Sequence, residues 1–410
     1  MGCVRRVASK GDIEDRGRER NDMTDSNSGG GALEGLRVVE MGQLIAGPFC
    51  GQLLGDMGAE IVKLEPPETG DQMRHWGQGD RPSWWRVIAR NKYSVAVDLR
   101  SAEGQQLARD LIAKADILIE NFRPGTLEKW NLDPAELRKT NPGLIVVRVS
   151  GYGQTGPYSA RAGFGGIGEA MGGWRGIVGY PDLPPARMGV SIGDTLAATY
   201  GCLGALAALH HRNKTGEGQI VDSALYEAVL QVMESTVADF SASGTKRRRT
   251  GSTLPGIAPS NVYPCKDGEY LIGANQDAVF ARLAAAMGRP ELASDERYAT
   301  HRARGARQEE LDALIGEWTR TMTIAELEAK MIEASVPAGR VYDAEDMLAD
   351  PHFAAREALV TVPDAELGEV TMQGVFPKLS ATPGSVRRPA PLAVGQDSAE
   401  VLERWLGRPA

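Results

Sequence analysis

The sequence predicts an α/β fold, with a parallel sheet in its first part and a smaller α+β part after it. Between residues 36 and 149, continuous runs of Val, Ile and Leu alternate with helical segments. Strands that are covered by helices on both faces of a parallel sheet have this pattern. The expected strands are Leu36–Met41, Glu60–Leu64, Ser94–Leu99, Asp116–Glu120 and Leu144–Val149, and the expected helices between them are Phe49–Met57, Ala102–Ala113 and Pro134–Thr140.

The chain changes character after the first part, which we place at residues 33–225. Residues 226–252 are predicted to form a linker, because Ser241–Ser252 is polar and carries a basic run. Residues 253–350 are predicted to form the smaller α+β domain, and residues 351–410 a second linker and a C-terminal part. The expected elements here are a loop at Leu254–Tyr263, a strand at Glu269–Ile272, and helices at Ala278–Met287, Gln308–Thr319, Ile324–Ala334 and Ser398–Leu406.

The composition is that of a soluble globular protein large enough for two or more domains. Of its 410 residues, 42% are hydrophobic and 24% are charged. The net charge of −8 argues against a nucleic-acid partner. The four cysteines are scattered and form no CxxC pair, which indicates a reducing, cytoplasmic setting.

Neither a membrane segment nor a metal site is expected. Residues 1–32 are poor in apolar residues, so they are predicted to be a disordered extension without a signal peptide. The apolar run that follows Asp194 is rich in Ala and Gly and is shorter than a bilayer requires. The five histidines show no metal-ligand spacing.

Two loops at the carboxyl ends of expected strands are candidates for a ligand site. Gly42–Pro48 follows the first strand, and Asn121–Gly125 follows the fourth. The second loop offers an aromatic face in Phe122 and a cation in Arg123, which suit a nucleotide. An ordinary turn between strand and helix explains the same residues equally well.

The segment Gly163–Gly168 matches the pattern GxGxxG but is not interpreted as a dinucleotide-binding turn. It does not directly follow a strand, and prolines surround Asp182, the acidic residue at the expected distance. These glycines instead indicate close approach of the backbone to a ligand or to another chain.

Asp194 stands just before a buried helix expected at Leu196–Leu209. A carboxylate at a helix N-terminus is favoured in its ionised form by the backbone N–H groups and the helix dipole. An ionised carboxylate among small residues can act as a nucleophile. Asp is also a preferred N-cap residue, and on local sequence alone the cap is the better explanation.

The order of several short motifs resembles that of one enzyme family, the family III CoA transferases. The resemblance covers the chain from Leu33 to Leu406. The motifs are Leu33–Val38, Ala46–Pro48, Gly58–Glu65, Asn91-Lys92, Glu120–Gly125, Gly151–Pro157, Arg161–Phe164, Gly193-Asp194, Lys214–Gln219 and Asp350-Pro351.

The resemblance implies a CoA transferase in which Asp194 is the catalytic residue. In relatives the carboxylate attacks an acyl-CoA thioester and forms an aspartyl-acyl anhydride, and CoA then passes through an aspartyl-CoA thioester to an acceptor acid. CoA and acyl-CoA are thus substrates, and no tightly bound cofactor is expected. The expected architecture is a Rossmann-like large domain plus a smaller domain, with the tail returning to the large domain and two chains interlocked as a homodimer.

The resemblance also assigns CoA-binding positions. Ile45 and Ala46 match a loop close to the substrate, and Lys129 stands where relatives often carry an arginine for phosphate. Three segments complete the expected CoA site. They are Val97, Asp98, Leu99 and Arg100 with Asn121, Phe122 and Arg123 for the adenosine part, and Ala162, Gly163, Phe164 and Gly165 near the pantetheine and thioester.

Departures from the family pattern disfavour some of the reactions that the family catalyses. Formyl-CoA transferase has glutamine in place of Ile45 and a glycine-rich lid in place of Thr253–Pro259. The α-methylacyl-CoA racemases need a His–Asp pair where this chain has Phe164 and Gly165, neither of which can move a proton. Many transferases keep an acid at the position of Gly165.

The pattern is most similar to transferases that use succinyl-CoA and short dicarboxylic or hydroxy-dicarboxylic acids. The second carboxylate of such an acceptor needs a cation, for which Arg74, Arg161 and Arg187 are candidates. Alternatives are an intramolecular transferase of the mesaconyl-CoA type, a formyl-CoA transferase, a racemase, a non-catalytic CoA-binding protein and a Rossmann oxidoreductase.

Overall fold

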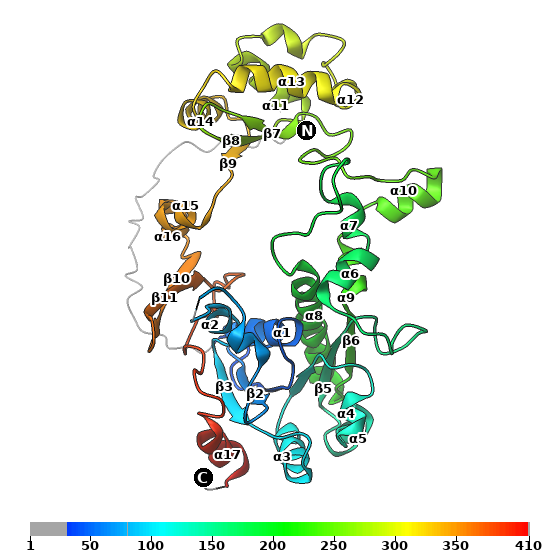
Figure 1. The fold of residues 1–410 in the computed structure, drawn as a ribbon, viewed down its shortest axis with the longest axis vertical. Helices are drawn as coiled ribbons and strands as arrows, with labels where there is room; N and C mark the ends of the chain where they lie inside the picture. The colour runs from blue at the N-terminus through cyan, green and yellow to red at the C-terminus, as the bar shows by residue number, and fades with distance from the viewer. Residues whose placement is uncertain (1–30, 80, 409–410) are drawn as a thin grey trace, which may run out of the picture.

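The structure is a computed structural model that describes residues 31–79 and 81–408 (Figure 1). The disorder predicted for residues 1–32 therefore lies, except for the last two, outside the described residues. At the centre is a six-stranded sheet with the order β3-β2-β1-β4-β5-β6, and all its pairings are parallel. Its strands are β1 (Arg37–Glu40), β2 (Glu60–Glu65), β3 (Lys92–Ala96), β4 (Ile117–Glu120), β5 (Ile145–Ser150) and β6 (Ile220–Ala224).

The five predicted strands are confirmed, and the sixth was missed. Strand β6 has the sequence Ile-Val-Asp-Ser-Ala and lies at the edge of the sheet, where its first three residues are exposed or half-buried. A half-exposed edge strand lacks the continuous apolar run by which the other strands were recognised.

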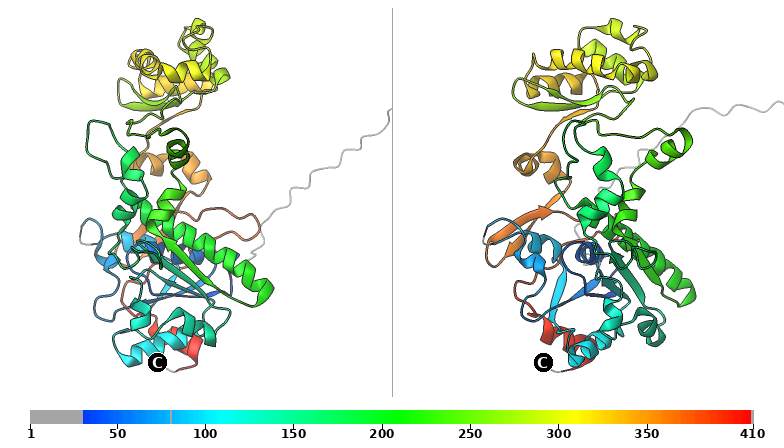
Figure 2. Two further views of the ribbon diagram at one scale, coloured as in Figure 1. Left: turned by 90° about the vertical axis from the view of Figure 1, so that its right-hand side faces the viewer. Right: turned by 45° about the vertical axis from the view of Figure 1, so that its right-hand side comes forward.

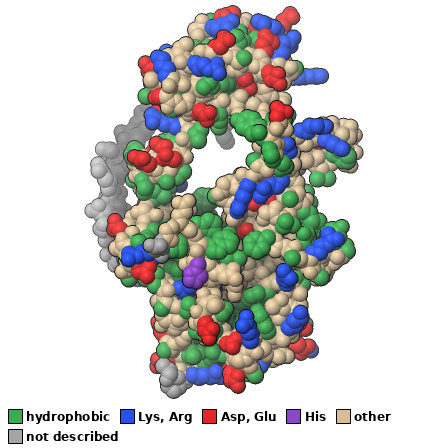
Figure 3. All heavy atoms as spheres, viewed as in Figure 1, with side chains coloured by type: hydrophobic (Ala, Val, Ile, Leu, Met, Phe, Trp, Pro, Cys, Tyr) green, Lys and Arg blue, Asp and Glu red, His purple; other side chains and the backbone are tan. Residues whose placement is uncertain are grey.

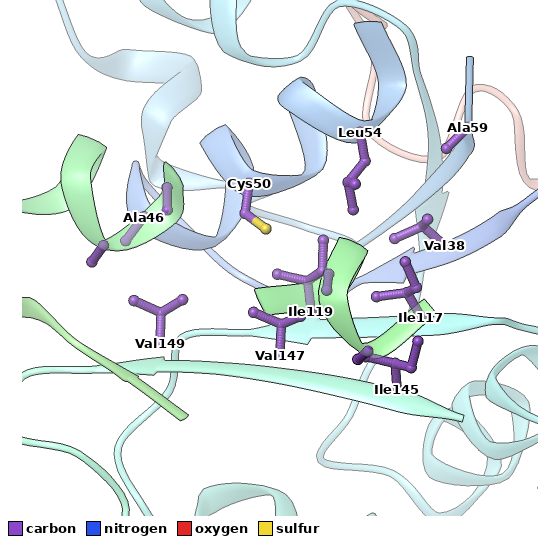
Figure 4. Packing of buried hydrophobic residues seen from close by; sticks show 14 of the residues in the cluster. Val38, Ala46, Cys50, Leu54, Ala59, Ile117, Ile119, Ile145, Val147 and Val149 are labelled. Carbon is purple, nitrogen blue, oxygen red and sulfur yellow. The ribbon is translucent and has the colours of Figure 1, made fainter. Parts of the chain in front are cut away.

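Helices cover both faces of the sheet, as predicted. On one face, small residues of α8 pack with apolar residues of β1, β4 and β5 (Figure 4). The second face is covered by helices that include the last helix of the chain. The first face carries α1 (Ala46–Asp56), α8 (Ile192–Thr215) and α9 (Leu225–Gln231); the second carries α3 (Ala102–Ile112), α4 (Thr126–Lys129), α5 (Pro134–Thr140) and α17 (Ser398–Leu406).

The tail lies against the first part of the chain. Val401 and Trp405 of α17 are buried in the same apolar cluster as Val39 and Val62. A hairpin of β10 (Leu359–Asp364) and β11 (Gly368–Gln373) is tied to α2 (Trp84–Ile88), because Nε of Arg86 donates to Asp364 at 2.6 Å. Residues far apart in the sequence thus form one body around the sheet.

A separate apolar cluster lies in residues 258–338, away from the sheet (Figure 2). Three antiparallel strands form its sheet, in the order β7-β8-β9. The predicted loop at Leu254–Tyr263 is wrong in its second half, because β7 begins directly after Pro259. The elements are β7 (Ser260–Pro264), β8 (Glu269–Gly273), β9 (Ala338–Arg340), α11 (Asp277–Ala286), α12 (His301–Ala306), α13 (Gln308–Thr319) and α14 (Ile324–Glu333), with a 3-10 helix at Pro290–Ala293.

Two connections join this part to the large sheet, and an opening passes between them (Figure 3). The segment predicted as a linker, 226–252, is partly helical, since it contains the rest of α9 and all of α10. The domain boundaries themselves stay predictions. The connecting helices are α6 (Gly165–Met171), α7 (Trp174–Ile177) and α10 (Thr236–Ser243) on one side and α15 (Ala344–Ala349) and α16 (Pro351–Ala355) on the other.

Helix α8 is longer than the apolar run predicted. Its 24 residues and its mean hydropathy of 1.3 over 18 residues are enough, by length and composition, to cross a membrane. The core helix of a soluble protein passes the same test, and Ala197, Ala198 and Ala205 of α8 pack against the sheet. The expectation that the chain does not enter a membrane stays a prediction.

Candidate active site

The two loops singled out in the sequence lie side by side. They follow β1 and β4, the adjacent strands at which the strand order reverses. The backbone N–H of Gln43 donates to Oδ1 of Asn121 at 2.8 Å, and Nδ2 of Asn121 donates to the carbonyl of Gln43 at 2.9 Å. In open parallel sheets the crevice at this point is the usual ligand site.

A buried set of charges fixes the loop after β1. Nζ of Lys63 lies 3.0 Å from Glu40 and 2.8 Å from Asp71, and it donates to the carbonyl of Gly42 at 2.7 Å. Oδ1 of Asp71 accepts from the N–H of Leu44, which has a φ of 64°. Neighbouring carboxylates hold the pKa of Lys63 above its usual range despite burial, so the ammonium stays charged.

One cavity, of about 650 Å³, contains Asp194. Both loops contribute to it, together with the segment that leads into α6 and the segment that leads into α8. The predicted residues that line this cavity are Ile45, Ala46, Asn121, Phe122, Gly163, Phe164, Arg187 and Asp194.

A second cavity, of about 870 Å³, contains Val97, Asp98, Leu99 and Arg100. Its walls also include Trp130 and the turn Pro66–Gly70 after β2. Gln43 and Phe122 line both cavities, so the two are neighbours. An elongated ligand such as CoA could therefore extend from one to the other along these two residues.

The interpretation of Asp194 as the N-cap is wrong. Helix α8 begins at Ile192, two residues before Asp194, and its N-cap residue is Ser191. Asp194 is consequently the third residue of the helix, and its side chain lies in the cavity rather than across the helix end. The expected start at Leu196 was too late, because the helix also includes Ile192, Gly193 and Asp194, which precede the apolar run.

The surroundings of Asp194 raise its pKa. Burial raises the pKa of Asp194 to about 6, and repulsion by Glu169 adds to this effect, whereas the guanidinium of Arg187 lowers the pKa. The contribution expected from the helix terminus stays a prediction. Most molecules still carry an ionised Asp194 at neutral pH, with little hydration to lose before it reacts.

Gly165 makes room for this carboxylate. A Cβ at position 165 would overlap Oδ2 of Asp194. The glycines predicted to approach a ligand or another chain thus approach this same chain, since Gly163 also packs directly on Gly151. An acidic side chain at position 165 would therefore displace the carboxylate of Asp194.

The remaining predicted residues do not line either cavity. Ala162, Arg123 and Lys129 are exposed. Arg74 is engaged with Glu65 and with carbonyls of the tail, and Arg161 lies over the ring of Tyr158 at 3.5 Å. Their predicted roles in ligand binding receive no support from this placement.

Sequence reasoning missed Arg175, Glu169 and Ser150. Arg175 and Ser150 line the cavity of Asp194, and Glu169 is buried beside it. Helical spacing could have indicated Glu169, because it follows Gly165 by one turn. Within residues 31–79 and 81–408, no group of three or more His, Cys, Asp or Glu could hold a metal ion.

Comparison with known proteins gives consistent results. The profile described as CoA-transferase family III matches residues 33–398. The chain is 56% identical to "Succinyl-CoA--D-citramalate CoA-transferase" of Chloroflexus aurantiacus, over 92% of this chain and 94% of that protein. It is 41% identical to the alpha subunit of "Succinyl-CoA--L-malate CoA-transferase" of the same organism, over 91% and 89% of the two chains.

A solved structure is similar in fold as well as in sequence. A protein of the CAIB/BAIF family from Brucella suis superposes with a TM-score of 0.81 and 34% identity. The match covers 92% of this chain and all of the other.

The raised pKa of Asp194 predicts that Asp194→Asn stabilises the protein at neutral pH. The fold penalises the ionised form above the unfolded pKa of 3.8, and the penalty grows until the pH passes about 6. We expect Asp194→Asn to increase the free energy of unfolding by about 3 kcal/mol at pH 7.5, and the gain to shrink towards zero as the pH falls to 4. Denaturant unfolding across this pH range measures the difference in free energy between the variant and the native protein. Asp182→Asn, at an exposed position, is the control. A difference that is the same at all pH values would contradict the prediction.

Proposed function

The chain belongs to CoA-transferase family III, and from this premise we propose that it moves CoA from succinyl-CoA to a short dicarboxylic or hydroxy-dicarboxylic acid, with Asp194 as the nucleophile. One observation carries the proposal: Asp194 lies in a cavity that adjoins a second cavity at Gln43 and Phe122. The names of the two Chloroflexus relatives support this class of donor and acceptor.

In the first half of the proposed reaction, a carboxylate oxygen of Asp194 attacks the thioester carbonyl carbon of succinyl-CoA. The C–S bond breaks, CoA leaves as a thiolate, and an aspartyl-succinyl anhydride forms. The thiolate then attacks the carbonyl carbon of Asp194. The C–O bond to the bridging oxygen breaks, succinate leaves, and Asp194 becomes a CoA thioester.

The second half runs the same steps with the acceptor. A carboxylate oxygen of the acceptor attacks the aspartyl thioester and expels the CoA thiolate, which gives a new anhydride. The thiolate attacks the acceptor's acyl carbon, so that acceptor-CoA forms and the Asp194 carboxylate is restored. No proton is gained or lost, which agrees with the absence of an acid or base at Phe164 and Gly165.

Residues around Asp194 have roles that suit this chemistry. Arg187, which acts electrostatically on Asp194, can stabilise the oxyanion that develops beside it. Ile45, Ala46 and Phe164 form an apolar wall that limits the access of water to the anhydride. The hydroxyl of Ser150 is buried at the cavity and lacks a partner among the described residues, so it can bond the ligand.

The second cavity is the proposed site for the adenosine part of CoA. Phe122 and Trp130 offer aromatic surface, with ring centroids 5.0 Å apart. Arg100 provides a cation in its wall for the phosphates, and Arg123 stays a prediction as a phosphate ligand. Lys129 is exposed on α4 and stays a prediction as a phosphate ligand.

The proposal includes an interlocked homodimer. The opening in Figure 3 lies between the two connections that join the small antiparallel sheet to the large one. Large apolar side chains that line the cavity of Asp194 are exposed in the single chain, Phe164 to 59% and Ile167 to 49%. Light scattering tests the state of association: we expect a molar mass twice that of the 44.0 kDa chain, and the mass of one chain would contradict the proposal.

Replacing Asp194 by alanine should abolish transfer. With succinyl-CoA and a panel of acids including citramalate, malate and glutarate, we expect kcat to fall by about 10³-fold or more, as for other covalent nucleophiles. A single turnover of the native enzyme with succinyl-CoA and an acceptor labelled by ¹⁸O in its carboxylate should add one ¹⁸O to the peptide that contains Asp194.

Retained transfer in Asp194→Ala, or the absence of label in that peptide, would contradict the mechanism. Conversion of an acyl-CoA in the absence of any acceptor would indicate intramolecular transfer between two carboxyls of one acid instead. Exchange of an α-proton with solvent would indicate a racemase.

Two adjacent glycines provide a matched pair of variants. In Gly165→Ala the new methyl group overlaps Oδ2 of Asp194, so the carboxylate must move, and we expect kcat to fall by about 10²-fold. In Gly166→Ala the nearest atom to the new methyl group is Nη2 of Arg175, at an ordinary 3.7 Å, so kcat should change less than about threefold. Steady-state rates of CoA transfer measure both, and equal effects of the two variants would contradict the assigned position of Asp194.

A further inference from the structure

Arg175 is a cation in the active-site cavity to which the family motifs drew no attention. It lies on α7 and lines the cavity of Asp194, and its side chain is 25% exposed. Its Nε donates to Oε2 of Glu169 at 2.7 Å. The cavity therefore contains a guanidinium that is partly accessible and already held at one edge.

Glu169 gives this arginine a fixed orientation. Its side chain is 1% exposed, and it belongs to α6, which packs against α8 and α9. Only Nε of Arg175 is engaged with it, and no hydrogen bond from the two terminal nitrogens is found among the described residues. Nη2 lies 3.7 Å from the point that a Cβ atom would occupy at Gly166, which is another residue of the cavity wall. These two nitrogens present the planar fork that binds a carboxylate.

The cavity holds two arginines with different surroundings. Arg187 lowers the pKa of Asp194 and donates from Nη2 to Oγ of Ser191, two residues before the helix turn that carries Gly193 and Asp194. Arg175 does not figure among the charges that shift Asp194 and is paired with Glu169 instead. Arg187 therefore acts on the Asp194 carboxylate, whereas Arg175 is available to bind a second charged group of the ligand.

We propose that Arg175, positioned by Glu169, binds the carboxylate of the substrate that does not react, and so makes the enzyme selective for dicarboxylic over monocarboxylic acids. The inference rests on the proposed function and deepens it, because it names the residue that selects the substrate class. Arg74 and Arg161 cannot take this role, since neither lines the cavity.

The charges also favour an order of binding. In the free enzyme the carboxylates of Asp194 and Glu169 balance the guanidiniums of Arg175 and Arg187. Once Asp194 has become a neutral CoA thioester, the cavity gains one net positive charge. A dianionic acceptor is then attracted more strongly than by the free enzyme.

The test compares an acceptor pair that differs only in its second carboxylate. Glutarate and pentanoate have the same chain length, and a methyl group replaces one carboxylate in pentanoate. In a double-displacement reaction, kcat/KM for the acceptor reports its own half-reaction and does not depend on the donor. Citramalate and malate are measured beside them, with the full-length enzyme and succinyl-CoA.

For Arg175→Gln we expect kcat/KM to fall about 100-fold with the dicarboxylic acids and less than about threefold with pentanoate. Glu169→Gln keeps a hydrogen-bond acceptor for Nε but removes a charge that acts on Asp194 with every acceptor, so it should lower the dicarboxylate values by about tenfold relative to the pentanoate value. Arg109→Gln removes a half-buried charge on α3 that lines neither cavity, and it should leave all values unchanged.

A loss that is equal for both kinds of acid in Arg175→Gln, or no loss, would overturn the inference. Unfolding midpoints of the variants separate a folding defect from an effect on selectivity, since a folding defect lowers both acids alike. If the native enzyme transfers CoA to none of the dicarboxylic acids, the proposed function itself fails. If it prefers them and Arg175→Gln keeps that preference, only the role of Arg175 fails.

Discussion

The ammonium group of Lys63 is the interaction on which the rest of the site depends. It is fully buried and contacts Glu40, Asp71 and the carbonyl of Gly42. Removing a charge from water costs several kcal/mol, so such a group persists only where partners satisfy it from all sides. Here the partners come from β1, from the loop that follows it and from the turn before α2. The requirement to satisfy Lys63 therefore determines the path of the loop between β1 and α1.

The path of this loop also determines how the two cavities adjoin. Asp71 holds Leu44 in its left-handed conformation, and Asn121 joins Gln43 to the loop after β4. Gln43 and Phe122 then form the boundary that the two cavities share. A rigid boundary of this kind would fix the distance between the two ends of CoA in the proposed binding mode. Positioning of this kind is a large part of the rate that an enzyme contributes.

The sequence predicted the parallel sheet and the two candidate loops at the carboxyl ends of its strands, because buried strands and the loops after them have strong local signals. Val, Ile and Leu runs located β1 to β5, whereas β6 was missed, since its exposed edge interrupts the apolar pattern. Asp194 was found, but its place in the helix was not, because Gly193 does not end or begin a helix by itself. Arg175 and Glu169 were missed for a different reason. Their pairing depends on how α6 and α7 are folded against α8, which no local pattern contains.

The position of Glu169 explains how a second carboxylate can act on Asp194 although this chain has glycine at position 165, where many transferases keep an acidic residue. An acidic side chain at position 165 would occupy the space of the nucleophile, as the overlap at Gly165 shows. Glu169 lies one helical turn further along α6, so it points from the same side of the helix while leaving that space free. From there it raises the pKa of Asp194 and holds Arg175. A single buried charge thus makes the Asp194 carboxylate more basic and orients the guanidinium of Arg175 in the cavity, and Gly165 leaves the space that this arrangement needs.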